Sequence, residues 1–365
     1  MTAIDSLSLE VTHTEKNNEN SFRQDVLNDY WICLISREAS LLGRKEVLNG
    51  KAKFGILGDG KELPQVAMAR AFKKGDWRSG YYRDQTFMFA RGLSSVEEYF
   101  SQLYADTEND PFSGGRQMNS HFATPMMDEN GDWLDQTKIF NVSSDISCTA
   151  GQMARGLGLA MASKKYRKLH IPSGKKFSDN GNEVSFVTIG DSSTSEGVFW
   201  ETMNAAAIMK VPLLVAVWDD GYGISVPVEM QTVKGSISKA LEGFLVDENG
   251  NGIMIFTVKG WDYPELCAVF EKVTLKVREL HIPALIHVQE LTQPQGHSTS
   301  GSHERYKSPE RLQWEKENDC IKRMAEWIVE NKIGTIEEVT TLQANAIEFA
   351  KNAKENAWKK YQQSV

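Results

Sequence analysis

Stretches with a helical pattern and stretches with a strand-like pattern alternate along the chain. In the helical stretches, apolar residues recur at three- and four-residue steps, the spacing of one helix face; these stretches are 21–43, 62–72, 151–168 and 196–209. Short apolar or β-branched runs, typical of buried strands, lie at 184–189, 212–218 and 283–289. The pattern therefore predicts a protein in which helices and strands alternate.

The order strand, helix, strand across 184–218 indicates a parallel sheet. A crossover between parallel strands needs a dozen or more residues, and the helix at 196–209 supplies it. We predict the α/β class: a parallel sheet with helices on both faces and a helical extension at each end of the chain. Loops rich in glycine and polar residues are expected at 54–60 and 78–92, and a polar, glycine-bearing hairpin or loop is expected at 173–182.

Three regions are expected along the chain. Residues 1–20 are mostly polar and are predicted to form a flexible arm. Residues 21–300 are predicted to form the α/β domain, and residues 301–365 a loop followed by a charged helical tail that starts near Pro309.

Charge and cysteine content exclude several classes of protein. The 365 residues carry a formal net charge of −8, which argues against a broad nucleic-acid or membrane-binding surface. The four cysteines are far apart and form no CxxC pair, so a disulfide framework is not expected. The N-terminus lacks the basic start and apolar core of a secretory signal, and no apolar run approaches the roughly 20 residues of a membrane-spanning helix. We expect a cytoplasmic protein with no nucleic-acid or membrane partner.

Two aspartates follow two of the predicted strands. Asp191 comes directly after the strand at 184–189, and Asp220 follows the strand at 212–218. If the strands are parallel neighbours, their carboxyl ends lie roughly 4.8 Å apart and both side chains project into one crevice. Either aspartate alone would more often be a helix cap or a turn former. The pair, separated by a helix and followed by Gly-Tyr-Gly, favours a shared site.

Converging carboxylates repel each other unless a cation or a proton lies between them. Oxygen ligands without nearby histidine or cysteine select a hard ion such as Mg²⁺ or Ca²⁺, and magnesium leaves coordination positions for phosphate oxygens. The run Ser193-Thr-Ser-Glu196 fits a capping box, which would start a helix whose N–H groups face the crevice. The residues predict a site for a metal-bridged diphosphate.

Several distinctive runs follow one another along roughly residues 60–310: YYRD at 81–84, GGRQMNSH at 114–121, GQMARGLGLAMASKK from 151, GDSSTSEG at 190–197, DDGYGIS at 219–225, and GHSTS with ERY around His297. In this order they resemble the alpha subunit, or alpha half, of the thiamine-diphosphate-dependent decarboxylase component of 2-oxo acid dehydrogenase complexes. The resemblance implies a thiamine-diphosphate-binding fold, with thiamine diphosphate and Mg²⁺ as cofactors.

The resemblance also assigns roles to residues. It places the metal on the side chains of Asp191 and Asp220 and on the backbone carbonyl of Tyr222. Tyr82 and Arg83 match a pair that binds the diphosphate, and a planar guanidinium suits phosphate oxygens. The turn residues expected to line the cofactor site with them are Gly190, Ser192 and Ser193.

Two histidines are candidates with less support from the residues themselves. His297 matches a loop histidine beside the cofactor, which is implicated in handling the diphosphate and in passing the acyl group to lipoamide. A histidine in a polar loop is often only solvent-exposed, so this catalytic assignment comes from the resemblance. His121 is a candidate for the wall of the active site, with no role assigned.

The activity that the resemblance implies is oxidative decarboxylation of a 2-oxo acid, of branched-chain or pyruvate type, with acyl transfer to a lipoyl-bearing partner. General likeness favours the branched-chain type. The partners implied are a beta subunit or a fused beta half, which would complete the active site in a heterotetramer, and the lipoyl-bearing acyltransferase component. A transketolase-like transferase and a noncatalytic scaffold subunit of the same fold are the alternatives.

Departures from the family's pattern concern the metal turn. The family usually has GDG and NNGYAIS, whereas this chain has Ser192 after Asp191 and Asp220 in place of asparagine. Serine fits only if its backbone avoids positive φ, and the extra carboxylate would bind a metal yet repel a diphosphate. A literal Gly58-Asp59-Gly60 has no strand pattern before it and is interpreted as unrelated to the metal. The run at 143–152, SSDISCTAGQ, matches poorly and predicts no site residue.

Overall fold

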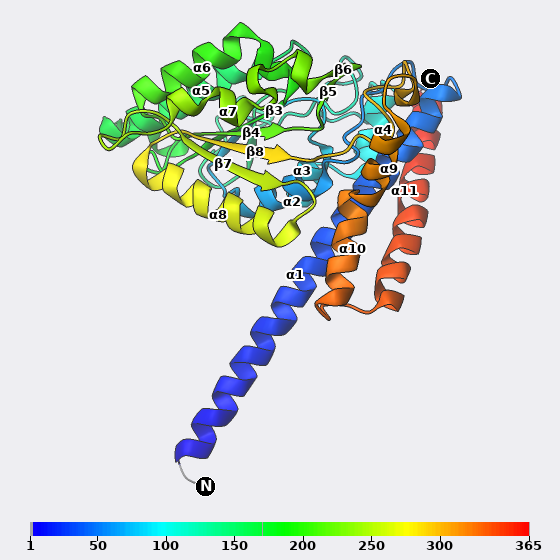
Figure 1. Cartoon of the computed structure of the whole chain (residues 1–365), viewed down its shortest axis with the longest axis horizontal. Helices are drawn as coiled ribbons and strands as arrows, with labels where there is room; N and C mark the ends of the chain where they lie inside the picture. The colour runs from blue at the N-terminus through cyan, green and yellow to red at the C-terminus, as the bar shows by residue number, and fades with distance from the viewer. Residues whose placement is uncertain (1–2, 170, 365) are drawn as a thin grey trace.

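The computed structural model describes residues 3–169 and 171–364 (Figure 1). Its strands are β1 (Trp77–Ser79), β2 (Asn141–Val142), β3 (Ser185–Gly190), β4 (Leu213–Trp218), β5 (Tyr222–Gly223), β6 (Val226–Pro227), β7 (Met254–Lys259) and β8 (Ala284–Gln289). Its α-helices are α1 (Ala3–Leu48), α2 (Glu62–Ala71), α3 (Gln85–Ala90), α4 (Val96–Leu103), α5 (Gln152–Lys168), α6 (Gly197–Met209), α7 (Ile237–Ala240), α8 (Tyr263–Leu280), α9 (Pro309–Glu317), α10 (Cys320–Glu330) and α11 (Ile336–Ser364).

Six strands form one sheet in the order β2-β1-β3-β4-β8-β7, and every neighbouring pair is parallel. The three predicted strands are confirmed as β3, β4 and β8. Strands β1, β2 and β7 were not predicted: two of them have only two or three residues, and β7 is only partly buried. A separate antiparallel pair, β5 and β6, follows the sheet strand β4.

Alternate residues of the central strands face opposite sides of the sheet. In β3, Phe186 belongs to one buried cluster, whereas Val187 belongs to the other. Helices α2 and α8 cover the first side, and helices α5 and α6 cover the second (Figure 1). The predicted α/β class, with a parallel sheet and helices on both faces, is confirmed.

Helix α5 lies against β3 through a glycine. A Cβ atom at Gly156 would overlap the Cγ2 atom of Val187, a fully buried side chain of the sheet. Gly158, two residues further along the same helix, has open space at that position. The sequence GLG in this helix therefore combines one glycine that packing requires with one that it does not.

We expect Gly156→Ala to lower the free energy of unfolding by about 1–3 kcal/mol, because the added methyl must displace a close-packed strand. Gly158→Ala is the matched control and should raise it by about 0.5–1 kcal/mol, since alanine is the better helix former. Urea denaturation of both variants checks this. Equal effects at the two positions would contradict the close helix–strand contact.

The terminal regions form a separate helical layer beside the sheet. Helix α1 was expected from residue 21 but begins at Ala3, so part of the stretch expected as a polar arm lies in this helix; its N-terminal part extends away from the rest of the molecule (Figure 1). Its C-terminal half packs on α11, with the rings of Trp31 and Phe349 5.6 Å apart. The tail is helical from Pro309, as predicted. The division into three regions stays a proposal.

The expected loop at 78–92 is only partly a loop. It contains the end of β1 and the whole of the short helix α3, both buried, because the polar residues there hydrogen-bond within the protein rather than to water. The loop at 54–60 has no regular structure, as predicted. None of the helices in the described part of the chain has the length and apolar character that crossing a membrane requires.

Candidate functional site

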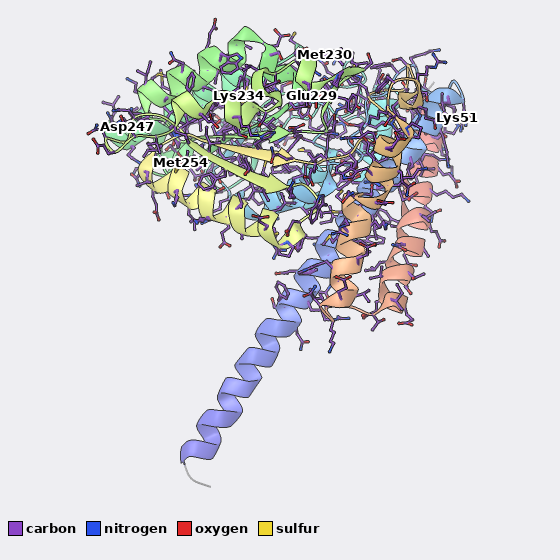
Figure 2. The ribbon with its side chains drawn as sticks, viewed as in Figure 1. Lys51, Glu229, Met230, Lys234, Asp247 and Met254 are labelled. Atoms are coloured by element: carbon purple, nitrogen blue, oxygen red, sulfur yellow. The ribbon has the colours of Figure 1, made fainter. Side chains whose placement is uncertain are left out.

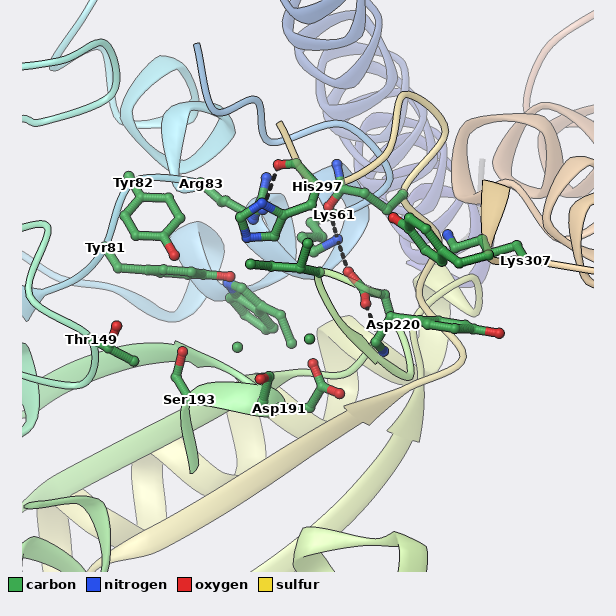
Figure 3. Close-up of a pocket in the computed structure, with 18 residues that line it drawn as sticks. Lys61, Tyr81, Tyr82, Arg83, Thr149, Asp191, Ser193, Asp220, His297 and Lys307 are labelled. Atoms are coloured by element: carbon green, nitrogen blue, oxygen red, sulfur yellow. Dashed lines mark hydrogen bonds and ion pairs between the residues drawn. The ribbon is translucent and has the colours of Figure 1, made fainter. Parts of the chain in front are cut away.

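The predicted site residues meet at the carboxyl ends of β3 and β4. The two strands pair in register through Gly190 and Trp218, so the turns that follow them lie side by side. Asp191 directly follows β3, and Asp220 is the second residue after β4. Both line one cavity of about 200 Å³ (Figure 3). The cavity is lined by Lys61, Tyr81, Tyr82, Arg83, Thr149, Gly190, Asp191, Ser192, Ser193, Trp218, Asp220, Tyr222, Gly223, Ile224, Gln293, His297, Tyr306 and Lys307.

Asp191 is a buried carboxylate without a full set of partners. Its residue is 5% exposed, and its Oδ2 atom has no hydrogen-bond partner among the described residues. Burial, together with the negative charges of Asp220 and Asp219, raises the pKa of this carboxyl well above its ordinary value. A cation beside Asp191 would provide a partner for its Oδ2 atom and would reduce the repulsion between the carboxylates.

Asp220 differs from Asp191 in that both of its carboxylate oxygens have partners. Its Oδ2 atom lies 2.8 Å from the ammonium of Lys61, and its Oδ1 atom accepts from the backbone N–H of Tyr222 at 3.1 Å (Figure 3). Burial, the largest single influence, raises its pKa, but the charge and hydrogen bond of Lys61 together with the charges of Lys307 and Arg83 outweigh it, and the pKa of Asp220 lies below its ordinary value. Asp220 is therefore an ionised carboxylate in a fixed orientation.

Lys61 was not predicted as a site residue. It follows Gly58-Asp59-Gly60, the run interpreted as unrelated to the metal, and Asp59 is indeed not among the lining residues; it accepts from the backbone N–H of Gln295 at 2.9 Å. A Cβ atom at Gly60, whose φ is +86°, would overlap the carbonyl of Thr292. This close approach of two loops brings Lys61 into the cavity, and the Gly-Lys pair was its only signal in the sequence.

Tyr82 and Arg83 both reach the cavity, as expected. Two donors of the Arg83 guanidinium are engaged, one with the carbonyl of Leu57 at 2.5 Å and one with the carbonyl of His297 at 2.8 Å. A guanidinium has five N–H donors, so others remain for an anion. Arg83 thus ties the loop of His297 to the loop before α2 while it adds positive charge to the cavity.

The two candidate histidines differ in position. His297 lines the cavity, and burial with the nearby charge of Arg83 lowers its pKa to about 4, so it is neutral at physiological pH. His121 is not among the lining residues. Its ring hydrogen-bonds to Ser147 at 2.7 Å and lies parallel to the ring of Tyr82, with 6.4 Å between centroids. His121 therefore supports Tyr82 from behind.

The loop after β4 is fastened by the C-terminal region. Tyr222 lies in β5, and its ring faces the ammonium of Lys307 at 5.1 Å and the ring of Tyr306 at 5.9 Å. The guanidinium of Arg311 donates to the backbone carbonyl of Asp220 at 2.7 Å. The ERY run near residue 305 thus contributes Tyr306 to the cavity wall, and Thr149 comes from the run at 143–152 that predicted no site residue.

The predicted capping box at 193–196 is wrong. Residues Ser192–Ser195 form a 3-10 turn, helix α6 begins only at Gly197, and Glu196 at its N-cap makes no side-chain cap hydrogen bond. The turn is instead closed by Thr194, whose hydroxyl donates to the carbonyl of Asp191 at 2.6 Å. Ser192 has helical rather than positive φ, so a serine fits where the family's pattern has glycine.

Asp84, the last residue of YYRD, belongs to the framework behind the site. Its carboxylate accepts from the guanidinium of Arg78, at 2.5 Å, and from the indole N–H of Trp218 at 3.2 Å. Arg78 also reaches Asp145 at 3.2 Å, and all three charged side chains are fully buried. This network links β1, β4 and the loop before α3, and so fixes Tyr82 and Arg83 relative to the two aspartates.

The residues fit a cation together with a polyanion. Asp191 offers an unpartnered carboxylate oxygen, Asp220 a second carboxylate, and oxygen ligands of this kind suit Mg²⁺. Lys61, Arg83 and Lys307 surround the same cavity with positive charge, which suits phosphate oxygens. Across residues 3–169 and 171–364 no group of three or more histidine, cysteine, aspartate and glutamate side chains gathers as a metal site, and the carboxylates among the lining residues of the cavity are those of Asp191 and Asp220.

Known proteins resemble this chain over most of its length. The family model described as the dehydrogenase E1 component matches residues 34–365. The 2-oxoisovalerate dehydrogenase subunit alpha of Bacillus subtilis is 27% identical over 303 residues, which cover 82% of this chain and 80% of that protein.

This chain matches only about half of the length of two further relatives. The mitochondrial 2-oxoisovalerate dehydrogenase subunit alpha 1 of Arabidopsis thaliana is 26% identical over 81% of this chain and 55% of its own length. The pyruvate dehydrogenase E1 component subunit alpha of Rickettsia typhi is 27% identical over 55% of this chain and 57% of its own length. Since the family model covers most of the chain, the chain belongs to the dehydrogenase E1 component family, as an alpha-type chain of a 2-oxo acid dehydrogenase.

Proposed function

We propose that this chain is the alpha part of an enzyme that uses thiamine diphosphate and Mg²⁺ to decarboxylate a 2-oxo acid oxidatively and to transfer the acyl group to a lipoyl-bearing partner. The observation that carries the proposal is the buried carboxylate of Asp191, whose Oδ2 atom has no hydrogen-bond partner among the described residues, beside Asp220 in a cavity that Lys61, Arg83 and Lys307 also line. The family's dependence on thiamine diphosphate supports it. When bound, that cofactor supplies the electron sink that loss of carbon dioxide from a 2-oxo acid requires.

We propose that different residues of the chain bind the metal and the diphosphate. Asp191, Asp220 and the backbone carbonyl of Tyr222 would hold Mg²⁺, and Tyr82 and Arg83 would bind the diphosphate. The turn that carries Asp191 would place the groups of Gly190, Ser192 and Ser193 along the same diphosphate. His297, neutral because its pKa is about 4, could accept a proton or a hydrogen bond at physiological pH, and we assign it the catalytic role in diphosphate handling and acyl transfer.

A beta subunit or beta half is proposed to complete the active site. Among the described residues that line the cavity, Asp191 and Asp220 are the carboxylates, so we propose that a further acid acting on another part of the cofactor comes from the beta part. Exposed apolar residues lie on the segment that follows β5: Ile224, Met230 and Val233 are 60%, 81% and 69% exposed. Figure 2 places Met230 and Glu229 at the outer edge of the molecule near β5 and β6. A cytoplasmic location and a heterotetramer belong to the same proposal.

The substrate type is the finer part of the proposal, and relatives named for 2-oxoisovalerate and for pyruvate both support the 2-oxo acid class. We propose the branched-chain type. The test is to purify the native protein with its beta partner and to measure release of carbon dioxide from 2-oxoisovalerate and from pyruvate, with conversion of lipoamide to S-acyldihydrolipoamide as the second readout. We expect turnover to require both chains, Mg²⁺ and thiamine diphosphate, with 2-oxoisovalerate preferred.

Other outcomes of this assay are informative. Pyruvate as the preferred substrate would correct the substrate type alone. Transfer of a two-carbon unit between sugars without acylation of lipoamide would favour the transketolase-like alternative. Tight association with the beta chain and no cofactor requirement would favour a noncatalytic scaffold and overturn the proposal.

A further inference from the structure

We infer that Lys61 is a positioning residue for the metal site: its ammonium neutralises Asp220, so that the Lys61–Asp220 pair acts as a single uncharged oxygen ligand beside Asp191. The inference rests on the proposed binding of magnesium and thiamine diphosphate at this site. It adds a residue from the loop before α2 to a proposed metal site whose other residues come from the turns after β3 and β4.

Lys61 is fixed in position by three acceptors. Its Nζ atom lies 2.8 Å from Asp220 Oδ2, 3.0 Å from the carbonyl of Thr292 and 2.6 Å from Gln293 Oε1. An ammonium has three N–H donors, so each has one acceptor. The residue is 1% exposed. Lys61 therefore belongs to the wall of the cavity rather than to a mobile arm.

The pair leaves Asp220 able to coordinate an ion. Lys61 occupies one side of Oδ2, and the N–H of Tyr222 occupies one side of Oδ1. A carboxylate has about four lone-pair positions, so two remain free toward the cavity. The backbone of Asp220 is held as well, by the guanidinium of Arg311. Its orientation thus depends on partners on three sides, while the Oδ2 atom of Asp191 has no partner in the described structure.

The Lys61–Asp220 pair reduces the negative charge in the cavity. Two ionised carboxylates and a diphosphate in one cavity would repel each other more strongly than one carboxylate, one neutral ligand and a diphosphate. Asp220 stands where the family's pattern has asparagine, which is neutral. Because a buried charge whose partner is removed is strongly unfavourable, we expect Lys61 and Asp220 to depend on each other, with the net charge of the pair as the quantity that matters.

The test is a double-mutant cycle with Lys61→Gln, Asp220→Asn and the double variant, compared with the wild-type chain. Glutamine and asparagine keep hydrogen-bonding groups at both positions and remove one charge each. Two quantities are measured: the Tm of the cofactor-free protein, and the Kd of thiamine diphosphate at saturating Mg²⁺ by calorimetric titration. Coupling between contacting residues is typically strong enough to appear as about a tenfold difference in such a cycle.

We expect each single variant to lower the Tm and to weaken thiamine diphosphate binding by about tenfold, because each leaves one buried charge unpaired. The double variant should recover most of both losses. Lys307→Gln is the matched control: Lys307 is a buried lysine of the same cavity, but its ion-pair partner is Glu315 at 2.7 Å. Combined with Asp220→Asn, it should show little recovery.

Additive losses in the double variant, for both Tm and Kd, would overturn the inference and would make Lys61 an independent ligand of the anion. The two proposals fail in different ways. If the wild-type chain together with its beta partner binds no thiamine diphosphate in the presence of Mg²⁺, the proposed function fails, whereas the Tm cycle still reports whether Lys61 and Asp220 form a mutually dependent pair.

Discussion

Asp191→Ala is expected to weaken magnesium-dependent binding of thiamine diphosphate at least about 100-fold, more than the loss of a residue that only supports a metal ligand. The alanine removes a carboxylate that the structure leaves buried and partly unpartnered, which is the strongest indication of a cation at this position. Calorimetric titration of the purified protein with thiamine diphosphate, with and without Mg²⁺, measures the effect.

A neutral residue in place of Asp191 should stabilise the protein when the cofactor is absent. Asp191→Asn removes the charge that burial and Asp220 disfavour, so the Tm of the cofactor-free protein should rise while cofactor binding is lost. Asp219→Asn is the control, since Asp219 bonds to His287 at 2.7 Å and does not line the cavity. It should retain cofactor binding to within about tenfold. A titration of Asp191→Ala that matches the wild type would remove Asp191 from the metal site.

The second large effect is expected at Arg78. Arg78→Met should lower the free energy of unfolding by about 3–5 kcal/mol, because it leaves the buried carboxylates of Asp84 and Asp145 without their cation. Burial already raises the pKa of Asp145 to about 7, even with Arg78 present. Urea denaturation measures the loss of stability.

Lys322→Met is the control for this prediction. Its ion pair with Glu326 is exposed and has a separation of 3.7 Å, so the change should be within about 0.5 kcal/mol. The network of Arg78 also fixes the loop that carries Tyr82 and Arg83, so any folded Arg78 variant should bind thiamine diphosphate more weakly as well. A loss of stability no larger than that of the control would mean that the buried network is not a structural anchor.

Local pattern was sufficient for the central part of the fold. The apolar runs that became β3, β4 and β8 have six residues each and are buried except for the last residue of β3 and of β8, so their composition alone identified them. Because they are parallel neighbours, the aspartates after β3 and β4 were predicted to meet, and both line the same cavity. The short strands β1 and β2 carry too few residues for a periodic signal, and tertiary contacts decide their conformation.

Parts of the site depended on contacts that no local pattern contains. Lys61 meets Asp220 across 159 positions of sequence, and only the packing of two loops at Gly60 brings them together. The capping box failed for a related reason: Thr194 bonds back to Asp191, which produces a 3-10 turn before the helix. In both cases the sequence contained the residues, but a competing partner, visible only in three dimensions, decided their roles.

The most direct test of the metal site is a crystal of the protein grown with thiamine diphosphate and Mn²⁺, which prefers the same oxygen ligands as Mg²⁺ and scatters anomalously. We predict one anomalous peak in the cavity, within coordination distance of carboxylate oxygens of both Asp191 and Asp220 and of the carbonyl of Tyr222, with the diphosphate on its other side. A peak that one of the two aspartates does not reach, or a diphosphate bound without any metal peak, would contradict the account.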